Sequence, residues 1–158
     1  MRKLIFLLII SQSIVLSSCL NVDNPNPGLS FEEQLKIDAD SIDSYLELNE
    51  IEAQIHQTGV RYIITKAGDG ESANTTDRVK VIYEGRFMDG SVFDSNSEGV
   101  SFPLNGLIAA WQITIPLLKE GGSMTIYAPS GYCYGPPGRS GIPPNSILFF
   151  DIELIEVE

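Results

Sequence analysis

The sequence predicts an α+β protein that combines a largely antiparallel β-sheet with an N-terminal helix and one short internal helix. Three observations predict this class. Apolar residues recur every three or four positions from Phe31 to Leu48, which is the period of a helix buried along one face. From Ile51 onward, apolar and polar residues alternate in short runs that are separated by glycine and proline, as in strands. Only residues 107–114 are typical of a helix in that half.

The composition excludes several classes of function. The 158 residues include 10 Lys and Arg against 21 Asp and Glu, and the formal net charge is −11. Nucleic acid is therefore not an expected partner, because phosphate binding needs clustered cations. The chain has one histidine, His56, and two cysteines, Cys19 and Cys133, too few for a zinc site with several such ligands. We expect chemistry that needs no metal, no cofactor and no imidazole base.

Residues 1–18 have the pattern of a secretory signal peptide. Two basic residues precede a broken apolar run that is too short to span a bilayer as a stable helix. The run ends in Leu-Ser-Ser-Cys at 16–19, which resembles the bacterial lipobox, where the cysteine is lipidated after cleavage. An ordinary leader with a free cysteine is the alternative, but no alanine before Ala39 supplies an A-x-A-like cleavage site.

We therefore expect lipidation of Cys19 and a mature chain anchored on the extracytoplasmic side of a bacterial envelope. Loss of Arg2 and Lys3 takes the charge from −11 to −13, so the lipid alone should hold the protein on an anionic membrane. Leu20 follows the cysteine in place of the aspartate that resembles an inner-membrane retention signal, which favours the outer membrane.

Residues 19–29 are expected to form a lipid-anchored linker, because they are polar and contain two prolines and a glycine. Residues 30–57 are expected to form the N-terminal helix and a connecting strand. Ser30 and Glu33 have capping-box spacing, so the helix should begin there. Its apolar stripe must be buried, and docking on its own domain is favoured over dimerisation. We therefore expect a monomer, with a dimer through this helix as the alternative.

Residues 58–158 are expected to form the main domain. Met88-Asp89-Gly90 predicts a hairpin turn. Pro116 ends the short helix, and residues 94–102 are interpreted as a loop. Alternation of apolar and polar residues predicts strands at 60–65, 79–84, 124–128 and 148–154.

Several motifs follow one another along this domain. They are VIYEG at 81–85, DGSVFDS at 89–95, FPL at 102–104, LI at 107–108, Trp111, YCYG at 132–135, GIPPN at 141–145 and LFFDIEL at 148–154. Taken in this order, they resemble the motifs of FKBP-type peptidyl-prolyl isomerases. The resemblance extends from about Val60 to Val157 with only short gaps. It implies a twisted antiparallel sheet wrapped around the short helix, and an enzyme that accelerates rotation about X-Pro bonds.

The resemblance also implies an apolar pocket for the proline ring. Trp111 would form its floor, and Tyr83, Phe93 and Phe150 would form its walls. Leu107 and Ile108 would contact the substrate beside them.

The resemblance assigns roles at the pocket to only a few polar groups. The Tyr134 hydroxyl would donate to a substrate carbonyl, and the Ile108 backbone N–H would bind another. Asp94 would lie near the twisting amide, or would order its own loop through nearby backbone N–H groups. Ile142 would be the apolar contact of the loop after Tyr134, and Arg139 is expected to be a solvated charge.

The sequence departs from the family pattern at several positions. Val100 stands where an aromatic wall is usual, and Ala110 replaces the glycine before Trp111. The segment from Asp94 to Phe102 is shorter than in small members. We therefore expect a shallower or narrower pocket.

The implied reaction suits a chain without a metal or cofactor. The barrier to rotation, about 18–20 kcal/mol, comes from the partial double bond of the amide. Water stabilises the polar planar amide, so a dry apolar pocket favours the twisted, less polar form. A thousandfold acceleration requires only about 4 kcal/mol of that preference.

Proline-containing polypeptides are the expected substrates, and macrolides are possible inhibitors. Two alternatives remain open. The first is a catalytically weak proline-binding or chaperone lipoprotein with the same fold, which Val100 and the shortened segment would permit. The second is a structural surface module such as a β-sandwich, which would show two facing sheets.

Overall fold

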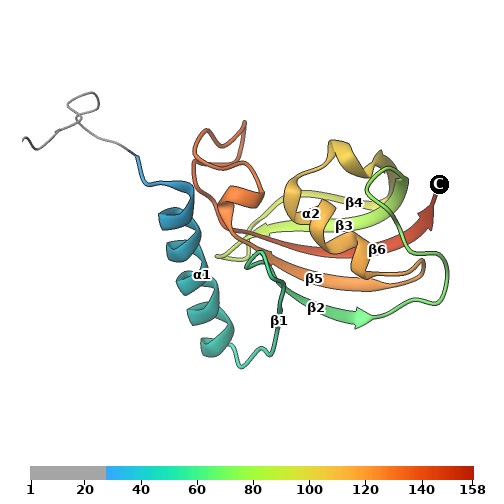
Figure 1. Cartoon of the computed structure of the whole chain (residues 1–158), viewed down its shortest axis with the longest axis horizontal. Coiled ribbons are helices and arrows are strands. Elements are labelled where there is room, and N and C mark those ends of the chain that lie inside the picture. Colours follow the sequence, from blue (N-terminus) through green and yellow to red (C-terminus); the bar gives the residue numbers. More distant parts are fainter. Residues whose placement is uncertain (1–27) are drawn as a thin grey trace, which may run out of the picture.

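The computed structural model describes residues 28–158 (Figure 1). The expected signal peptide, the expected lipidation site Cys19 and most of the expected linker lie outside the described residues. The helices and strands are α1 (Phe31–Leu48), β1 (Gln54–Ile55), β2 (Arg61–Lys66), β3 (Arg78–Phe87), β4 (Val92–Pro103), α2 (Ala109–Thr114), β5 (Ser123–Ala128) and β6 (Leu148–Val157). Three 3₁₀ turns are η1 (Leu104–Gly106), η2 (Ile115–Leu117) and η3 (Ser130–Tyr132).

All six strands belong to one sheet with the order β1-β2-β5-β6-β3-β4, and every neighbouring pair is antiparallel. The sheet curves past α2, which lies against one face (Figure 1). The predicted α+β class is therefore confirmed. The alternative of two facing sheets is wrong, because the strands of the described chain form a single ladder.

The main core lies between the sheet and α2. On β5, Met124, Ile126 and Ala128 point to this side, and each is at most 2% exposed. The alternating residues of β6 do the same, since successive side chains of a strand point to opposite faces. Those residues of β6 are Leu148, Phe150, Ile152 and Leu154. The periodicity of the sequence thus becomes the inner face of the sheet.

Helix α1 packs on its own domain, beside the end of the sheet remote from the C-terminus (Figure 1). The capping box is present: Ser30 Oγ accepts from the Glu33 N–H at 3.2 Å, and the Glu33 carboxylate accepts from the Ser30 N–H at 2.9 Å. Ile42, which is fully buried, and Leu46 join a second apolar cluster on the outer face of the sheet with Tyr127 and Phe149. The expectation that the helix docks on its own domain is confirmed.

Two local predictions were wrong. Residues 94–102, expected as a loop, belong to the edge strand β4, which pairs with β3 along its length. Shifts in register between Val81 and Tyr83 and between Gly85 and Arg86 absorb extra residues as bulges, so a polar segment without alternation still forms a ladder. Strand β1 contains only two residues, Gln54–Ile55, fewer than the alternation from Ile51 suggested.

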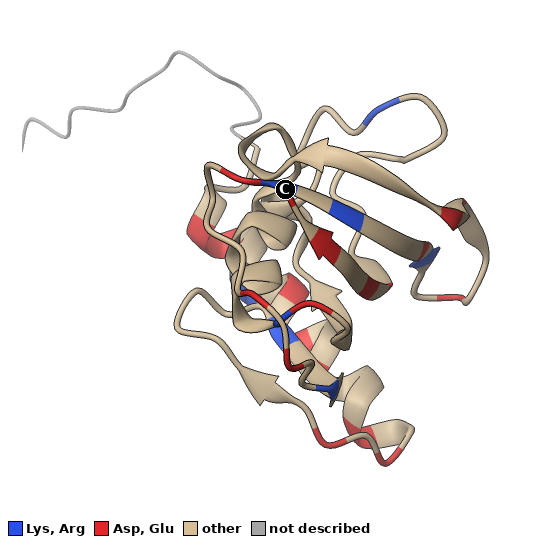
Figure 2. Ribbon diagram, turned by 90° about the vertical axis from the view of Figure 1, so that its right-hand side faces the viewer, with Lys and Arg blue, Asp and Glu red and all other residues tan. Residues whose placement is uncertain are grey.

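Charged residues occur in many parts of the described chain. Figure 2 shows acidic positions on α1, the loops and the sheet, with basic positions scattered among them. No helix within residues 28–158 is long and apolar enough to cross a membrane.

Candidate active site

A cavity of about 290 Å³ lies between the sheet and α2. It is lined by Tyr83, Phe93, Asp94, Phe102, Leu107, Ile108, Trp111, Tyr134, Arg139 and Phe150. Eight of the candidate residues from the sequence are in this set, although they come from four different elements and two connecting segments. A wider hollow of about 480 Å³ is also present, but Tyr83 is the only one of the five candidate aromatic residues that lines it.

Trp111 is the aromatic centre of the cavity. It is 4% exposed and packs edge-to-face with Tyr83, at 5.1 Å between ring centroids and 76° between planes. Phe150 packs against the other side of Trp111 at 5.5 Å and 89°. Phe93 extends the set by packing on Phe150 at 5.8 Å and 88°. Edge-to-face packing holds each ring in one orientation, so the walls are preorganised.

The start of α2 explains how Trp111 reaches the cavity. Leu107 and Ile108 are extended, with φ/ψ of −92°/173° and −60°/149°, so the helix begins at Ala109. The sequence predicted a helical start two residues earlier. Ala110 is fully buried, and Trp111 faces the sheet one residue later.

Gly85 on β3 makes room for the wall. It lies opposite Phe150 in the ladder with β6 and opposite Asp94 in the ladder with β4. A Cβ atom at Gly85 would be 2.6 Å from Phe93 Cζ, far inside normal contact distance. The missing side chain therefore leaves the space in which the Phe93 ring is seated.

Tyr83 and Asp94 form one polar pair of the cavity. The Tyr83 hydroxyl donates to Asp94 Oδ2 at 3.0 Å. Burial, followed by this hydrogen bond and the Asp94 charge, raises the pKa of Tyr83 to about 12. Within residues 28–158, the Asp94 side chain accepts from Tyr83 and from no backbone N–H of its own loop. The Asp94 carboxylate is therefore bound to Tyr83 at the cavity.

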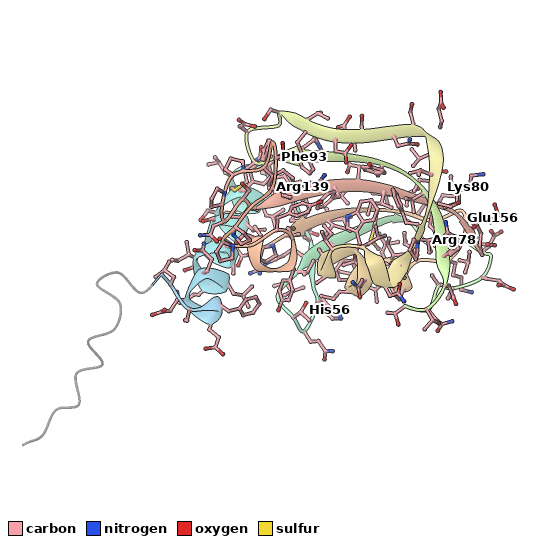
Figure 3. The ribbon with its side chains drawn as sticks, turned by 90° about the horizontal axis from the view of Figure 1, so that it is seen from above. His56, Arg78, Lys80, Phe93, Arg139 and Glu156 are labelled. Carbon is pink, nitrogen blue, oxygen red and sulfur yellow. The ribbon has the colours of Figure 1, made fainter. Side chains whose placement is uncertain are left out.

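Tyr134 and Arg139 form a second polar pair, in which the tyrosine hydroxyl accepts a hydrogen bond and does not donate it. Arg139 Nη1 donates to the Tyr134 hydroxyl at 3.0 Å, and its guanidinium carbon lies 5.0 Å from the centroid of the Tyr134 ring. A guanidinium has no acceptor, so this contact leaves the hydroxyl hydrogen available for another group. Arg139 is exposed, as expected for a solvated charge, and it also lines the cavity and lies close to Phe93 (Figure 3).

Two N–H groups at the start of α2 lack a hydrogen-bond partner within the described residues. In the described chain, Trp111 Nε1 is buried without a hydrogen-bond partner, and the Ile108 backbone N–H makes no hydrogen bond. Buried donors are usually paired, so unpaired donors at a cavity are available to a ligand. The cavity is thus apolar, with a few donors at its edges.

Two candidate residues lie outside the main cavity. Ile142 is 5% exposed and lines an adjoining hollow of about 190 Å³ together with Phe93, Asp94 and Arg139. Val100 pairs with Val81 on the neighbouring strand and does not line the cavity. Phe102, two residues further along β4, supplies a ring instead. Phe102 belongs to the FPL motif found in the sequence. Because side chains two residues apart in a strand point to the same face, Phe102 lies on the same face of β4 as Val100.

Comparisons with known proteins identify the family of this chain. Residues 69–155 match the family described as FKBP-type peptidyl-prolyl cis-trans isomerase. FkpA of Escherichia coli is 40% identical over 104 residues, which are 64% of this chain and 38% of that protein. The isomerase Mip of Coxiella burnetii is 39% identical over 104 residues, which are 63% of this chain and 45% of that protein. The chain therefore spans less than half the length of these two relatives.

Solved structures show the same fold. The crystal structure of FkpA from Escherichia coli has a TM-score of 0.68 and 36% identity, and covers 80% of this chain and 63% of that one. The structure of a peptidyl-prolyl cis-trans isomerase from Pseudomonas syringae has a TM-score of 0.69 and 26% identity, and the match covers 84% of this chain and 99% of that one. Because the matched segment is more than half of its sequence, the chain belongs to the FKBP-type peptidyl-prolyl cis-trans isomerase family.

Proposed function

We propose that this protein is a peptidyl-prolyl cis-trans isomerase that accelerates X-Pro rotation in exported polypeptides. The observation that carries the proposal is the cavity of about 290 Å³ with Trp111 as its floor and the rings of Tyr83, Phe93 and Phe150 around it. A proline ring is compact and apolar, and such a cavity excludes water from it. Desolvation destabilises the planar amide more than the twisted one.

The polar groups at the edge have separate roles in this proposal. The Tyr134 hydroxyl, which receives a hydrogen bond from Arg139, donates to one substrate carbonyl. The free Ile108 N–H donates to another. Asp94 is held beside the twisting amide by Tyr83. Each hydrogen bond contributes about 1 kcal/mol, so these contacts and ring packing together supply the roughly 4 kcal/mol needed for a thousandfold effect.

Substrate contacts continue beyond the cavity. The hollow lined by Ile142, Asp94 and Arg139 receives the residue that precedes proline. Leu107 and Ile108 contact the other side of the peptide, and Val100, which pairs with Val81, lies outside the cavity.

A protease-coupled assay on a Leu-Pro or Phe-Pro peptide tests the activity. Tyr134→Phe is expected to lower kcat/KM about fivefold, which corresponds to one lost hydrogen bond. Tyr62→Phe is the matched control, because it removes a hydroxyl that binds the exposed Gln54 side chain. If isomerisation in the presence of the protein still takes tens to hundreds of seconds, as it does spontaneously, the result would instead favour the catalytically weak proline-binding lipoprotein. A macrolide should compete with the peptide for the same cavity.

We also propose that the protein is a monomeric lipoprotein of a bacterial envelope. In this proposal residues 1–18 are a cleaved signal peptide, Cys19 carries the lipid, and residues 19–29 tether the folded part outside the cytoplasm. The lipobox-like residues 16–19 support the proposal, and Leu20 favours the outer membrane. Cells expressing the chain should incorporate a palmitate analogue into it, and a Cys19→Ser variant should not. Absence of label in the unaltered chain would refute lipidation.

A further inference from the structure

Helix α1 carries a buried carboxylate. Asp38 is 2% exposed, and its Oδ2 accepts two hydrogen bonds from Ser130, from the backbone N–H at 2.7 Å and from the hydroxyl at 2.6 Å. Its Oδ1 accepts from Gln34 Nε2 at 2.7 Å. Ser130 is fully buried and lies 92 residues further along the chain. The contact therefore joins the N-terminal helix to the segment after β5.

Ser130 in turn holds the backbone around Tyr134. Its carbonyl accepts from the N–H of Cys133 and from the N–H of Gly135, both at 2.9 Å. These two residues flank Tyr134, whose side chain lines the cavity. One carbonyl therefore fixes the chain on both sides of Tyr134, and the other hydrogen-bonding groups of that serine are bound to Asp38.

The first turn of α1 supports the same segment. The Phe31 ring packs edge-to-face on Tyr132 at 5.6 Å and 85°. A Cβ atom at Gly131 would be 2.5 Å from a Phe31 ring carbon, so the contact is close. The Tyr132 hydroxyl donates to the Thr58 carbonyl at 2.9 Å. Residues 130–135 are thus held in place largely from outside the sheet.

Helix docking alone does not require the Asp38 carboxylate. Ile42 and Leu46 already bury the apolar stripe, and Asp43 accepts from Arg61 Nε and Nη2 at 2.8 and 2.6 Å. Burying a further charge is unfavourable unless charge-assisted hydrogen bonds satisfy it. Asp38 has those bonds, and two of the three go to Ser130.

We propose that Asp38 is a positioning residue, which acts through Ser130 to fix the backbone at Tyr134 and hence the place of its hydroxyl in the cavity. Helix α1 is then a part of the isomerase and not only a spacer after the linker. This inference rests on the proposed isomerase activity, and its test separates the two.

The test uses four substitutions in the full chain: Asp38→Ala, Asp38→Asn, Ser130→Ala and Asp43→Ala. Asp43→Ala is the matched control, because it weakens docking of the same helix without touching residues 130–135. Thermal unfolding defines a temperature at which each variant is folded, and kcat/KM is measured there. Asp38→Ala and Ser130→Ala should each lower kcat/KM about fivefold, the factor for one hydrogen bond. Asp38→Asn should lose less, because its amide oxygen still accepts from the Ser130 N–H.

A double-mutant cycle with Tyr134→Phe separates positioning from a general structural effect. If Asp38 acts through the Tyr134 hydroxyl, Asp38→Ala should cost about twofold or less in the Tyr134→Phe background. An undiminished fivefold loss in that background would overturn the proposal. Wild-type kcat/KM in folded Asp38→Ala and Ser130→Ala would also overturn it, as would an equal loss in Asp43→Ala.

A second readout does not depend on activity. Burial, together with the Asp38 charge, raises the pKa of the neighbouring Cys133 thiol, which therefore reacts slowly with iodoacetamide. Ser130→Ala retains the carboxylate, so any faster alkylation of Cys133 reports opening of residues 130–135. Mass spectrometry should show alkylation about fivefold faster in Ser130→Ala and unchanged in Asp43→Ala. If the unaltered chain has no isomerase activity, the proposed function fails, and an unchanged alkylation rate would refute the positioning role separately.

Discussion

Substitution of Gly85 by alanine tests the cavity from behind its wall. The new Cβ would lie 2.6, 3.0 and 3.1 Å from Phe93 Cζ, Cε2 and Cε1. Carbon atoms pack best at about 3.5–4.0 Å, so the ring must retreat by about 1 Å. Phe87 and Phe150 pack against that ring at 5.2 and 5.8 Å, which leaves the cavity as the open direction. The ring would then occupy part of the space for proline.

The magnitude follows from two effects. Overpacking a core side chain costs about 1–3 kcal/mol of stability, and about 1 kcal/mol lowers Tm by about 2–4 °C in a chain of this size. A displacement of about 1 Å at a catalytic wall costs up to about 100-fold in rate. We therefore expect Gly85→Ala to lower kcat/KM by about 10- to 100-fold, with a fall in Tm of several degrees.

The protease-coupled isomerase assay measures this loss, and the fluorescence of Trp111, the one tryptophan of the chain, reports the rearranged cavity. Gly106→Ala is the control, because its Cβ would lie 3.4 Å from Pro103 Cγ, an ordinary contact. The reasoning would be refuted by a Gly85→Ala protein with wild-type kcat/KM, Tm and Trp111 emission.

Three further predictions concern single contacts. Arg139→Gln should lower kcat/KM about two- to fivefold with little change in Tm, because it weakens the hydrogen bond that directs the exposed Tyr134 hydroxyl. An unchanged kcat/KM would show that this contact has no role in turnover. The pKa of Tyr83 is raised to about 12, so the native state retains that proton when the unfolded chain has lost it. Its contribution to stability is present below pH 10 and is lost between about pH 10 and 12. Chemical denaturation should therefore show that the free energy of unfolding falls less steeply over this pH range in Tyr83→Phe than in the unaltered chain. Ile42→Ala should lower the free energy of unfolding by about 2–5 kcal/mol, because Ile42 is fully buried where α1 packs against Tyr127 and Phe149 of the sheet. A loss below about 1 kcal/mol in urea titration would contradict its place in that apolar cluster.

Local periodicity explains which parts of the fold were predictable. Helix α1, the hairpin at Met88-Asp89-Gly90 and strands β5 and β6 follow from spacing and capping within a few residues. Strand β4 was missed, because its polar residues at an exposed edge carry no alternation of their own. Its backbone is ordered by hydrogen bonds to β3, which no short window of sequence contains.

The site shows the same division. The order of the motifs located Tyr83, Phe93, Trp111 and Phe150, which the cavity brings together. Arg139 is exposed as expected, but its contact with Tyr134 at the cavity was not predicted, because an arginine in a Pro- and Gly-rich loop has no local feature that fixes its direction. The sequence predicted no role for Gly85 beyond its place in the VIYEG motif, because that role is to leave space for a ring eight residues away.

By itself, the amino-acid order determined which faces of the helix and strands are apolar, and with them the fold class and the family. Only the tertiary structure decided which polar groups meet: Asp38 with Ser130, Arg139 with Tyr134, and Tyr83 with Asp94. Burial of apolar surface depends on the period of a sequence, which short segments contain. A hydrogen bond depends on distance and direction between two atoms, and folding alone brings those atoms together from distant parts of the chain.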